Sequence, residues 1–205
     1  MAIYKPNKLD IMILLWLLMG WFVLEQYVHS NQMNKILTPG AYTLKMSFYF
    51  KNSWEDYTRR ASQSPLPQDL VFDAPLSLQD AMDIGHEKLS PTDDNNTFGR
   101  SEYYATATES LEAGAGDCDE YATLWYEVLR QQGWRVGVAV GYIWGEFRGG
   151  HAVTIAQSER GEFYVLDVQN TRPIPLNEWL YAEEAVLVYV GDQNGTHRFN
   201  RWING

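Results

Sequence analysis

The stretch "GAGDCDEYATLWYEVLRQQG", residues 114–133, decides the expected fold, because it predicts a long helix that begins at the chain's only cysteine. Apolar side chains recur through it at the spacing of one helix face, and they are Cys118, Tyr121, Ala122, Trp125, Val128 and Leu129. Gly133 follows this run, and glycine is common directly after the last residue of a helix. We therefore expect a helix from Asp117 to about Gln132, with the thiol in its first turn.

The start of this helix surrounds the thiol with acids, which oppose formation of a thiolate. Asp117 occupies the N-cap position and Glu120 follows three residues later, an arrangement in which both carboxylates accept hydrogen bonds from backbone N–H groups. Cys118 then lies where unpaired N–H groups and the helix dipole favour an anion. Gly114 and Gly116 permit a tight turn before it. The pattern indicates a reactive thiol, although a lone cysteine is more often a small buried apolar residue.

Downstream of this helix the hydrophobic pattern becomes that of extended strands. Runs rich in β-branched and aromatic residues alternate with turn sequences such as "GEFRGG" and "SERGE", and they cover residues 135–144, 151–157, 162–169 and 185–191. Upstream, helices are predicted over residues 77–89, with Ser77 as the cap, and over residues 101–113. Helices followed by consecutive strands predict an α+β fold in which the cysteine helix packs on a mostly antiparallel sheet.

A nucleophilic cysteine normally has a base beside it, and one of the four histidines is well placed for this role. His151 opens a predicted strand directly after two glycines, and Asp167 is a lone acid in the apolar run "YVLDVQN" on the next strand. A buried carboxylate requires a partner, and orienting a histidine would provide one. Cys118, His151 and Asp167 therefore form a candidate catalytic triad.

Each of these residues also has a structural explanation. His151 could be a turn residue, and Asp167 could end its strand and cap the next turn. A metal site with Cys118, His151 and Asp167 as ligands is a further alternative, but the separation of 33 residues (151 − 118) between cysteine and histidine matches no common zinc spacing.

Composition excludes two classes of protein. The chain has 16 basic and 26 acidic residues, a net charge of −10, and no cluster of lysine or arginine. Nucleic-acid binding requires a concentrated basic face, so we expect no nucleic-acid partner. A single cysteine cannot form an intrachain disulfide, so the fold is not held together by disulfides.

The first 30 residues are expected to be a signal peptide or a membrane anchor, followed by one domain over residues 31–205. Lys5 and Lys8 precede an apolar run of 14 residues, Ile11–Leu24. This run is short for a spanning helix, which needs roughly 20 residues, and is typical of a signal peptide. Either alternative places the domain outside the cytoplasm.

The segment from Glu109 to Ile143, with "GGHAVTIAQ" and "EFYVLDVQN", resembles the transglutaminase-like superfamily of papain-type cysteine enzymes. Within it the chain is most similar to the exported bacterial transglutaminase-like cysteine proteinases. The resemblance implies a papain/transglutaminase-like core with Cys118 as nucleophile, His151 as general base and Asp167 as the residue that orients it.

Members of this bacterial group include periplasmic, calcium-dependent proteases that cleave large biofilm adhesins. The resemblance therefore implies an exported thiol protease in the periplasm or on the outer face of the inner membrane, with a protein substrate such as a surface adhesin. The chemistry itself needs no cofactor, but calcium would bind at Asp117, Asp119 and Glu120. The backbone N–H of Cys118 and a hydroxyl from Tyr103, Tyr104 or Tyr142 are candidate oxyanion donors.

Two other functions remain open from the sequence. The acyl-enzyme could react with an amine instead of water, as in a transglutaminase. The chain could also be an inactive binding module on the same fold, since a fold alone does not prove activity. Contact with a membrane is expected only if the N-terminal segment is uncleaved.

Overall fold

The computed structural model describes residues 41–100, 103–144 and 149–205, with side chains described from Tyr49 onward. Its contacts separate Met1–Leu44 from a compact unit, Lys45–Gly205, which is the unit described below. The expected signal segment or anchor at residues 1–30 lies outside the described residues. Within the described part, no helix is long and apolar enough to cross a membrane.

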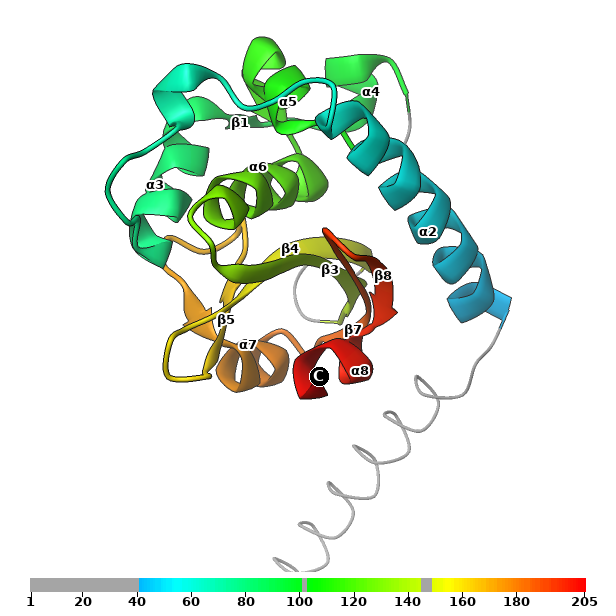
Figure 1. The fold of residues 1–205 in the computed structure, drawn as a ribbon. Coiled ribbons are helices and arrows are strands. Elements are labelled where there is room, and N and C mark those ends of the chain that lie inside the picture. The colour runs from blue at the N-terminus through cyan, green and yellow to red at the C-terminus, as the bar shows by residue number, and fades with distance from the viewer. Residues whose placement is uncertain (1–40, 101–102, 145–148) are drawn as a thin grey trace, which may run out of the picture. The chain divides into compact units, whose positions relative to one another are not determined.

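A six-stranded sheet forms the centre of this unit, with strand order β6-β5-β4-β3-β7-β8 (Figure 1). Every neighbouring pair in it is antiparallel. The strands are β3 (Arg135–Ile143), β4 (Gly149–Gln157), β5 (Phe163–Leu166), β6 (Ile174–Pro175), β7 (Val186–Asp192) and β8 (Gly195–Arg198). The predicted α+β class with an antiparallel sheet is confirmed, and four of these strands lie within or close to the predicted runs.

Helices cover both faces of the sheet (Figure 1). The cysteine helix α6 (Cys118–Gln131) lies on one face, and α7 (Leu176–Ala182) and α8 (Phe199–Asn204) lie on the other. Side chains of β3 alternate between the two cores that result: Val138 packs in the core shared with α6, and Ala139 in the core shared with α7 and α8. This period of two is the physical basis of the strand prediction.

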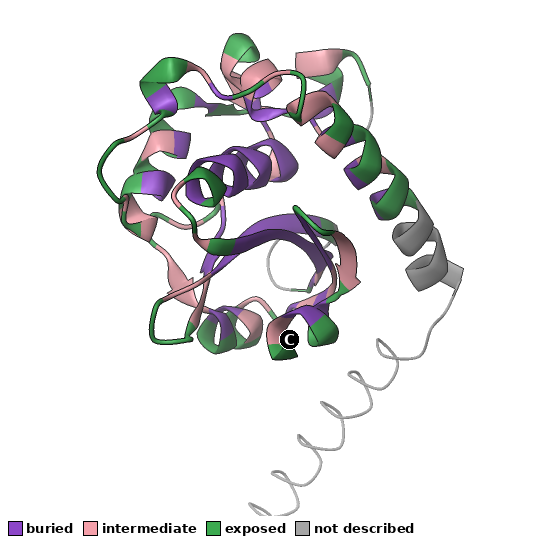
Figure 2. Cartoon of the chain, in the orientation of Figure 1, coloured by how far each residue is buried: buried purple, intermediate pink, exposed green. Residues whose placement is uncertain are grey.

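Helix α6 is buried all round from Asp119 to Leu129, as the purple of its central turns in Figure 2 shows, whereas the sequence predicted one apolar stripe. Several of its polar side chains are satisfied by neighbouring elements, whereas the Trp125 indole N–H has no hydrogen-bond partner among the described residues. The Thr123 hydroxyl donates to the Ala105 carbonyl at 3.1 Å. Glu127 accepts a hydrogen bond from the Tyr57 hydroxyl at 2.8 Å. The second face of α6 therefore packs against upstream segments that the sequence did not place.

Those upstream segments contain helices, two of which, over residues 41–61 and 94–98, were not predicted. Helix α2 (Ala41–Ala61) contributes Phe50, Trp54 and Tyr57 to the core beside α6. The remaining elements are the 3₁₀ turn η1 (Gln68–Leu70), α3 (Leu78–Lys88), α4 (Asp94–Phe98), α5 (Ala107–Ala113) and the short parallel pair β1 (Ser90–Pro91) and β2 (Ala115–Gly116). Helix α3 and its Ser77 cap confirm the prediction for residues 77–89.

The helix predicted over residues 101–113 is wrong for residues 103–106, and residues 101–102 lie outside the described residues. Residues 103–106 are not helical, and α5 begins at Ala107 after a capping box formed by Thr106 and Glu109. The backbone before the cap makes tertiary hydrogen bonds instead. The Tyr103 N–H donates to Asp94, and the Ala105 N–H donates to Glu120. These bonds keep the segment extended, and tertiary contacts outweigh its helical pattern.

Gly141 is expected to be essential for stability, because a side chain there would collide with the neighbouring strand. A Cβ atom at this position would lie 2.1 Å from the Val186 carbonyl oxygen, so Gly141→Ala must displace β7. We expect a loss of about 3 kcal/mol in the free energy of unfolding, measured by urea denaturation. For the control Gly150→Ala, no described atom lies within 4 Å of the new Cβ, and a change above about 1 kcal/mol there would contradict this explanation.

Candidate active site

Cys118 is the first residue of α6, and the predicted capping box is present at the start of the helix. The Asp117 N–H donates to Glu120 at 3.0 Å, and Asp117 accepts from the Asp119 N–H at 3.3 Å. Gly116 has no room for a side chain, because a Cβ there would lie 2.3 Å from the Glu120 Cβ. The local sequence thus places the half-buried thiol in the first helical turn, as expected.

His151 and Asp167 form a buried pair on neighbouring strands. His151 lies in β4, and its Nε2 is 2.9 Å from Asp167 Oδ1, with the two residues 8% and 1% exposed. Asp167 lies one residue beyond the end of β5, so its expected position inside the strand is wrong. It also accepts the Gln169 N–H at 3.0 Å. The two explanations considered for Asp167, orienting a histidine and capping a turn, therefore both describe it.

Trp179 completes the surroundings of this pair and was not predicted. Its indole N–H donates to Asp167 Oδ2 at 2.9 Å, and its ring stacks on the His151 ring with centroids 6.5 Å apart. A buried carboxylate needs several hydrogen-bond donors. A lone acid in an apolar run of the sequence therefore indicates that it has a partner besides His151. The sequence does not identify that partner, because α7 reaches Asp167 only through the packing of the sheet.

Replacing Asp167 with asparagine is expected to lower kcat strongly. The amide would direct N–H donors at His151 or Trp179, which are themselves donors toward Asp167. We expect kcat to fall by about 10³-fold or more because the imidazole loses its orienting acceptor. A matched variant, Trp179→Phe, keeps the ring and removes one donor, and its kcat should fall by about tenfold or less. Equal activity of Asp167→Asn and the unmodified protein would contradict this role.

The structure brings Cys118 to the strand of His151. The N–H of Ala152, the residue after His151, is directed at the Cys118 sulfur as a hydrogen-bond donor. Because Nε2 of His151 faces Asp167, Nδ1 is the ring nitrogen that remains for the thiol. Among the described residues no hydrogen bond joins the sulfur and the imidazole. Catalytic hydrogen bonds are often long before substrate binds.

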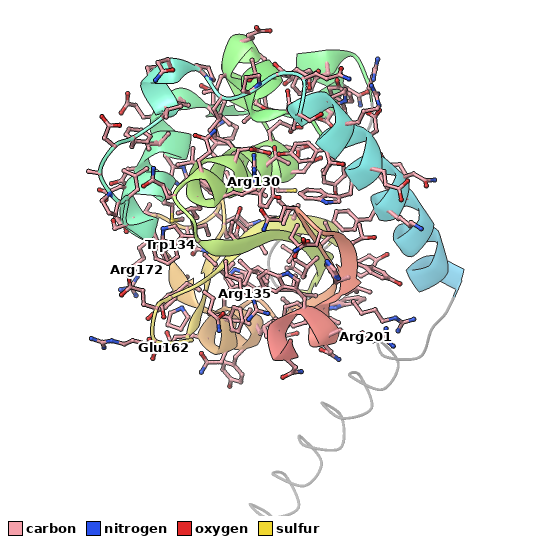
Figure 3. The ribbon with its side chains drawn as sticks, in the orientation of Figure 1. Arg130, Trp134, Arg135, Glu162, Arg172 and Arg201 are labelled. Carbon is pink, nitrogen blue, oxygen red and sulfur yellow. The ribbon has the colours of Figure 1, made fainter. Side chains whose placement is uncertain are left out.

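The surroundings of the thiol oppose its ionisation. Burial raises the pKa of Cys118 well above its ordinary value, and the charges of Asp119 and Asp117 raise it further. The Ala152 N–H acts in the opposite direction. Arg130, labelled in Figure 3, does not compensate, because it lies in the last turn of α6, about 18 Å along the helix from Cys118. A thiolate at this position therefore requires a nearby cation.

Three buried carboxylates lie together behind the thiol. Oxygen atoms of Asp94, Asp119 and Glu120 are all within 4.8 Å of one another. Burial is the main reason why the pKa of Glu120 is raised to about 8. Burial and then the contact with Asp117 raise the pKa of Asp119 well above its ordinary value.

The cluster contains two of the three residues that were predicted to bind calcium. Asp119 and Glu120 belong to it, whereas Asp117 groups with Cys118 and Asp119 instead. Asp94 was missed by the sequence analysis. Asp93, the residue before it, caps α4. An acidic pair at a helix start is common for this reason, so the sequence gives no sign that Asp94 also belongs to a cluster of buried acids.

One of the candidate oxyanion donors, Tyr103, has a hydrogen-bond acceptor within the fold. The Tyr103 hydroxyl donates to Glu109 at 2.9 Å. Its only proton is therefore already used in a hydrogen bond and is not free to bind an oxyanion. The candidates that remain are the Cys118 backbone N–H, Tyr104 and Tyr142.

The C-terminal hairpin repeats the arrangement around Asp167 without a thiol. Asp192 accepts from His197 at 3.0 Å, from the Asn194 N–H at 2.7 Å and from the Trp202 indole at 2.8 Å. Since the only cysteine is Cys118, this group holds α8 on the hairpin. The proximity of Cys118 distinguishes the site at Asp167 from this group.

Comparison with known proteins decides the family. The family model described as "bacterial transglutaminase-like cysteine proteinase BTLCP" matches residues 61–204, more than half of the chain. The chain belongs to this family. The protein is accordingly a cysteine peptidase, and the family match confirms the resemblance noted in its sequence. A search among curated proteins finds no match.

Solved structures similar to this proteinase include Legionella pneumophila LapG. Calcium-bound LapG is 16% identical, the match covers 72% of this chain and 88% of LapG, and the TM-score is 0.52. EGTA-treated LapG is 14% identical over 83% of this chain and 85% of LapG, with a TM-score of 0.50. At this identity the likeness concerns the fold, and it confirms the predicted transglutaminase-like core.

Proposed function

We propose that Cys118, His151 and Asp167 hydrolyse a peptide bond of a protein substrate through a thioester acyl-enzyme. The observation that carries this proposal is the buried hydrogen bond from His151 to Asp167. The next residue along the chain, Ala152, directs its N–H at the only thiol, Cys118. Membership of a cysteine proteinase family supports it, because a nucleophilic cysteine is required and the chain has one.

The geometry assigns a role to each residue. The Nε2–H of His151 donates to Asp167, which leaves the lone pair on Nδ1 to take the proton of Cys118. The thiolate attacks the carbonyl carbon, and His151 then returns the proton to the leaving amine as the C–N bond breaks. Water, deprotonated by His151, attacks the thioester and releases the acid and Cys118. The buried Asp167 stabilises the imidazolium during both steps.

The cluster of Asp94, Asp119 and Glu120 is proposed to bind calcium. Carboxylate oxygens are the ligands that calcium prefers, and three of them buried within 4.8 Å would repel one another when ionised. Burial, and then the charges of Asp94 and Asp117, raise the pKa of Glu120. Bound calcium would supply positive charge next to the turn that carries Cys118. The structure of LapG, which has a similar fold, is calcium-bound, and this supports the proposal that a protein of this fold binds calcium.

We further propose that residues 1–30 direct export and that the substrate is a large surface protein of the adhesin type. The basic residues before the apolar run Ile11–Leu24 support export. N-terminal sequencing of the protein from fractionated cells distinguishes a cleaved signal from an anchor. Accumulation of the uncleaved chain in the cytoplasm would contradict export.

The acyl-enzyme is tested with p-nitrophenyl acetate, which does not depend on knowing the substrate. We expect a burst of p-nitrophenol and an acetyl group on the peptide that contains Cys118, detected by mass spectrometry. Adding Nα-acetyl-lysine methyl ester separates the two reactions. Acetate as the main product supports hydrolysis, whereas acetylated lysine would show amine transfer. Absence of any acetyl group on Cys118 would favour an inactive binding module.

A further inference from the structure

We propose that helix α3 sets the position of Asp167 relative to Cys118, and that His86 is its main positioning residue. The inference rests on the proposed triad and adds to it a residue that lies outside the three elements carrying the triad. His86 lies in the last turn of α3 and is exposed, although its ring packs against Tyr121 and Trp125 of α6.

One side of α3 holds the loop that follows Asp167. His86 Nε2 lies 2.9 Å from the Asn170 carbonyl oxygen, and Gln79 Nε2 donates to the Thr171 carbonyl at 3.0 Å. The Asn170 N–H in turn donates to the Asp167 carbonyl at 2.9 Å. A carbonyl oxygen only accepts, so Nε2 of His86 carries a hydrogen in the neutral and in the charged ring alike. The contact therefore persists when His86 is protonated.

The same helix is fixed to the elements around Cys118. The strand that follows α3 pairs with the glycine turn before the cysteine, with the Ser90 N–H donating to Gly114 at 3.0 Å. The His86 ring packs on α6 itself, 5.6 Å from the Tyr121 ring. Gly85 allows this close approach, since a Cβ there would lie 2.2 Å from Trp125 Nε1.

Helix α3 thus bridges the two sides of the proposed site. Its C-terminal end is tied to the turn of the nucleophile, and its side chains are tied to the loop of the orienting acid. Residues 168–171 lie between β5 and β6 and make no ladder hydrogen bonds with the sheet. Val168 packs against the core and the Gln169 N–H donates to Asp167, and the bonds from α3 hold the next two residues, Asn170 and Thr171. A displacement of about 1 Å in a catalytic group lowers a rate by as much as about 10²-fold.

The test compares two replacements of His86 in the full chain. His86→Phe keeps a ring against Tyr121 and removes the donor, whereas His86→Gln places an amide N–H near the position of Nε2. With p-nitrophenyl acetate, we expect kcat of His86→Phe to fall about tenfold with KM changed less than about twofold. His86→Gln should recover most of the loss. Glu87→Gln, on the adjacent exposed position of α3, is the control.

The outcomes separate this inference from the proposed function. An unchanged kcat in His86→Phe, or equal losses in His86→Phe and His86→Gln, would overturn the positioning role. A thermal midpoint of His86→Phe close to that of the unmodified protein, with the loss confined to kcat, supports it. If the unmodified protein itself shows no turnover that depends on Cys118, the proposed function fails instead.

Discussion

Replacing Cys118 with alanine is expected to lower the turnover of p-nitrophenyl acetate by at least about 10³-fold, because no thioester can form without the sulfur. Folding should change little, since the half-buried thiol packs at the edge of the core. The measurement is the initial rate of p-nitrophenol release, with the far-ultraviolet circular dichroism spectrum as a check of folding. Retention of most of the activity would contradict the nucleophile assignment.

The single thiol makes a matched measurement possible. Because Cys118 is the only cysteine, iodoacetamide reports its reactivity without interference from other thiols. We expect His151→Ala to slow alkylation of the folded protein near neutral pH, because the thiolate loses the imidazolium that stabilises it. The control His197→Ala removes a histidine with the same kind of aspartate partner but no neighbouring thiol. Equal effects of the two substitutions would indicate a general loss of structure.

Removal of calcium is expected to make stability fall as pH rises from about 5 to about 8. The pKa of Glu120 is about 8 in the folded chain against an ordinary value of 4.5, so between these values the folded chain holds a proton that the unfolded chain has lost. The free energy of unfolding then decreases with increasing pH, by as much as several kcal/mol at about 1.4 kcal/mol per pKa unit.

Calcium is expected to reverse this dependence, because it binds the ionised carboxylates of the folded chain and not the unfolded chain. Urea denaturation at several pH values, in EGTA and in excess calcium, measures both effects. In Asp119→Asn the response to calcium should be lost. Asp192→Asn, which alters a buried acid outside the cluster, should retain it. A stability that is the same with EGTA and with calcium at every pH would rule out the calcium site.

The local parts of the structure were predictable from the sequence because their hydrogen bonds join residues a few positions apart. The capping box at Asp117 and Glu120, the helix after it and the Ser77 cap all belong to this class. The alternation of apolar residues likewise predicted the strands, since it follows from the two-residue period of an extended chain. His151 and Asp167 could be selected as partners because one short turn joins their strands.

Tertiary packing decided what local pattern could not. Trp179 reaches Asp167 from α7, and Asp94 reaches Asp119 and Glu120 from the start of α4. Neither contact leaves a periodic signal in the sequence. The segment before α5 resembles a helix and stays extended, because its N–H groups donate to Asp94 and Glu120.

The sequence by itself therefore determined the class of fold, the family resemblance and the three residues of the proposed triad. Only the tertiary structure decided that Asp167 lies beyond its strand, that α6 is buried on every side, and that α3 holds the loop of Asp167. The physical reason is the range of the interactions. Caps and periodicity act within one or two turns of chain, whereas burial and charge clustering depend on which distant segments the packed core brings together.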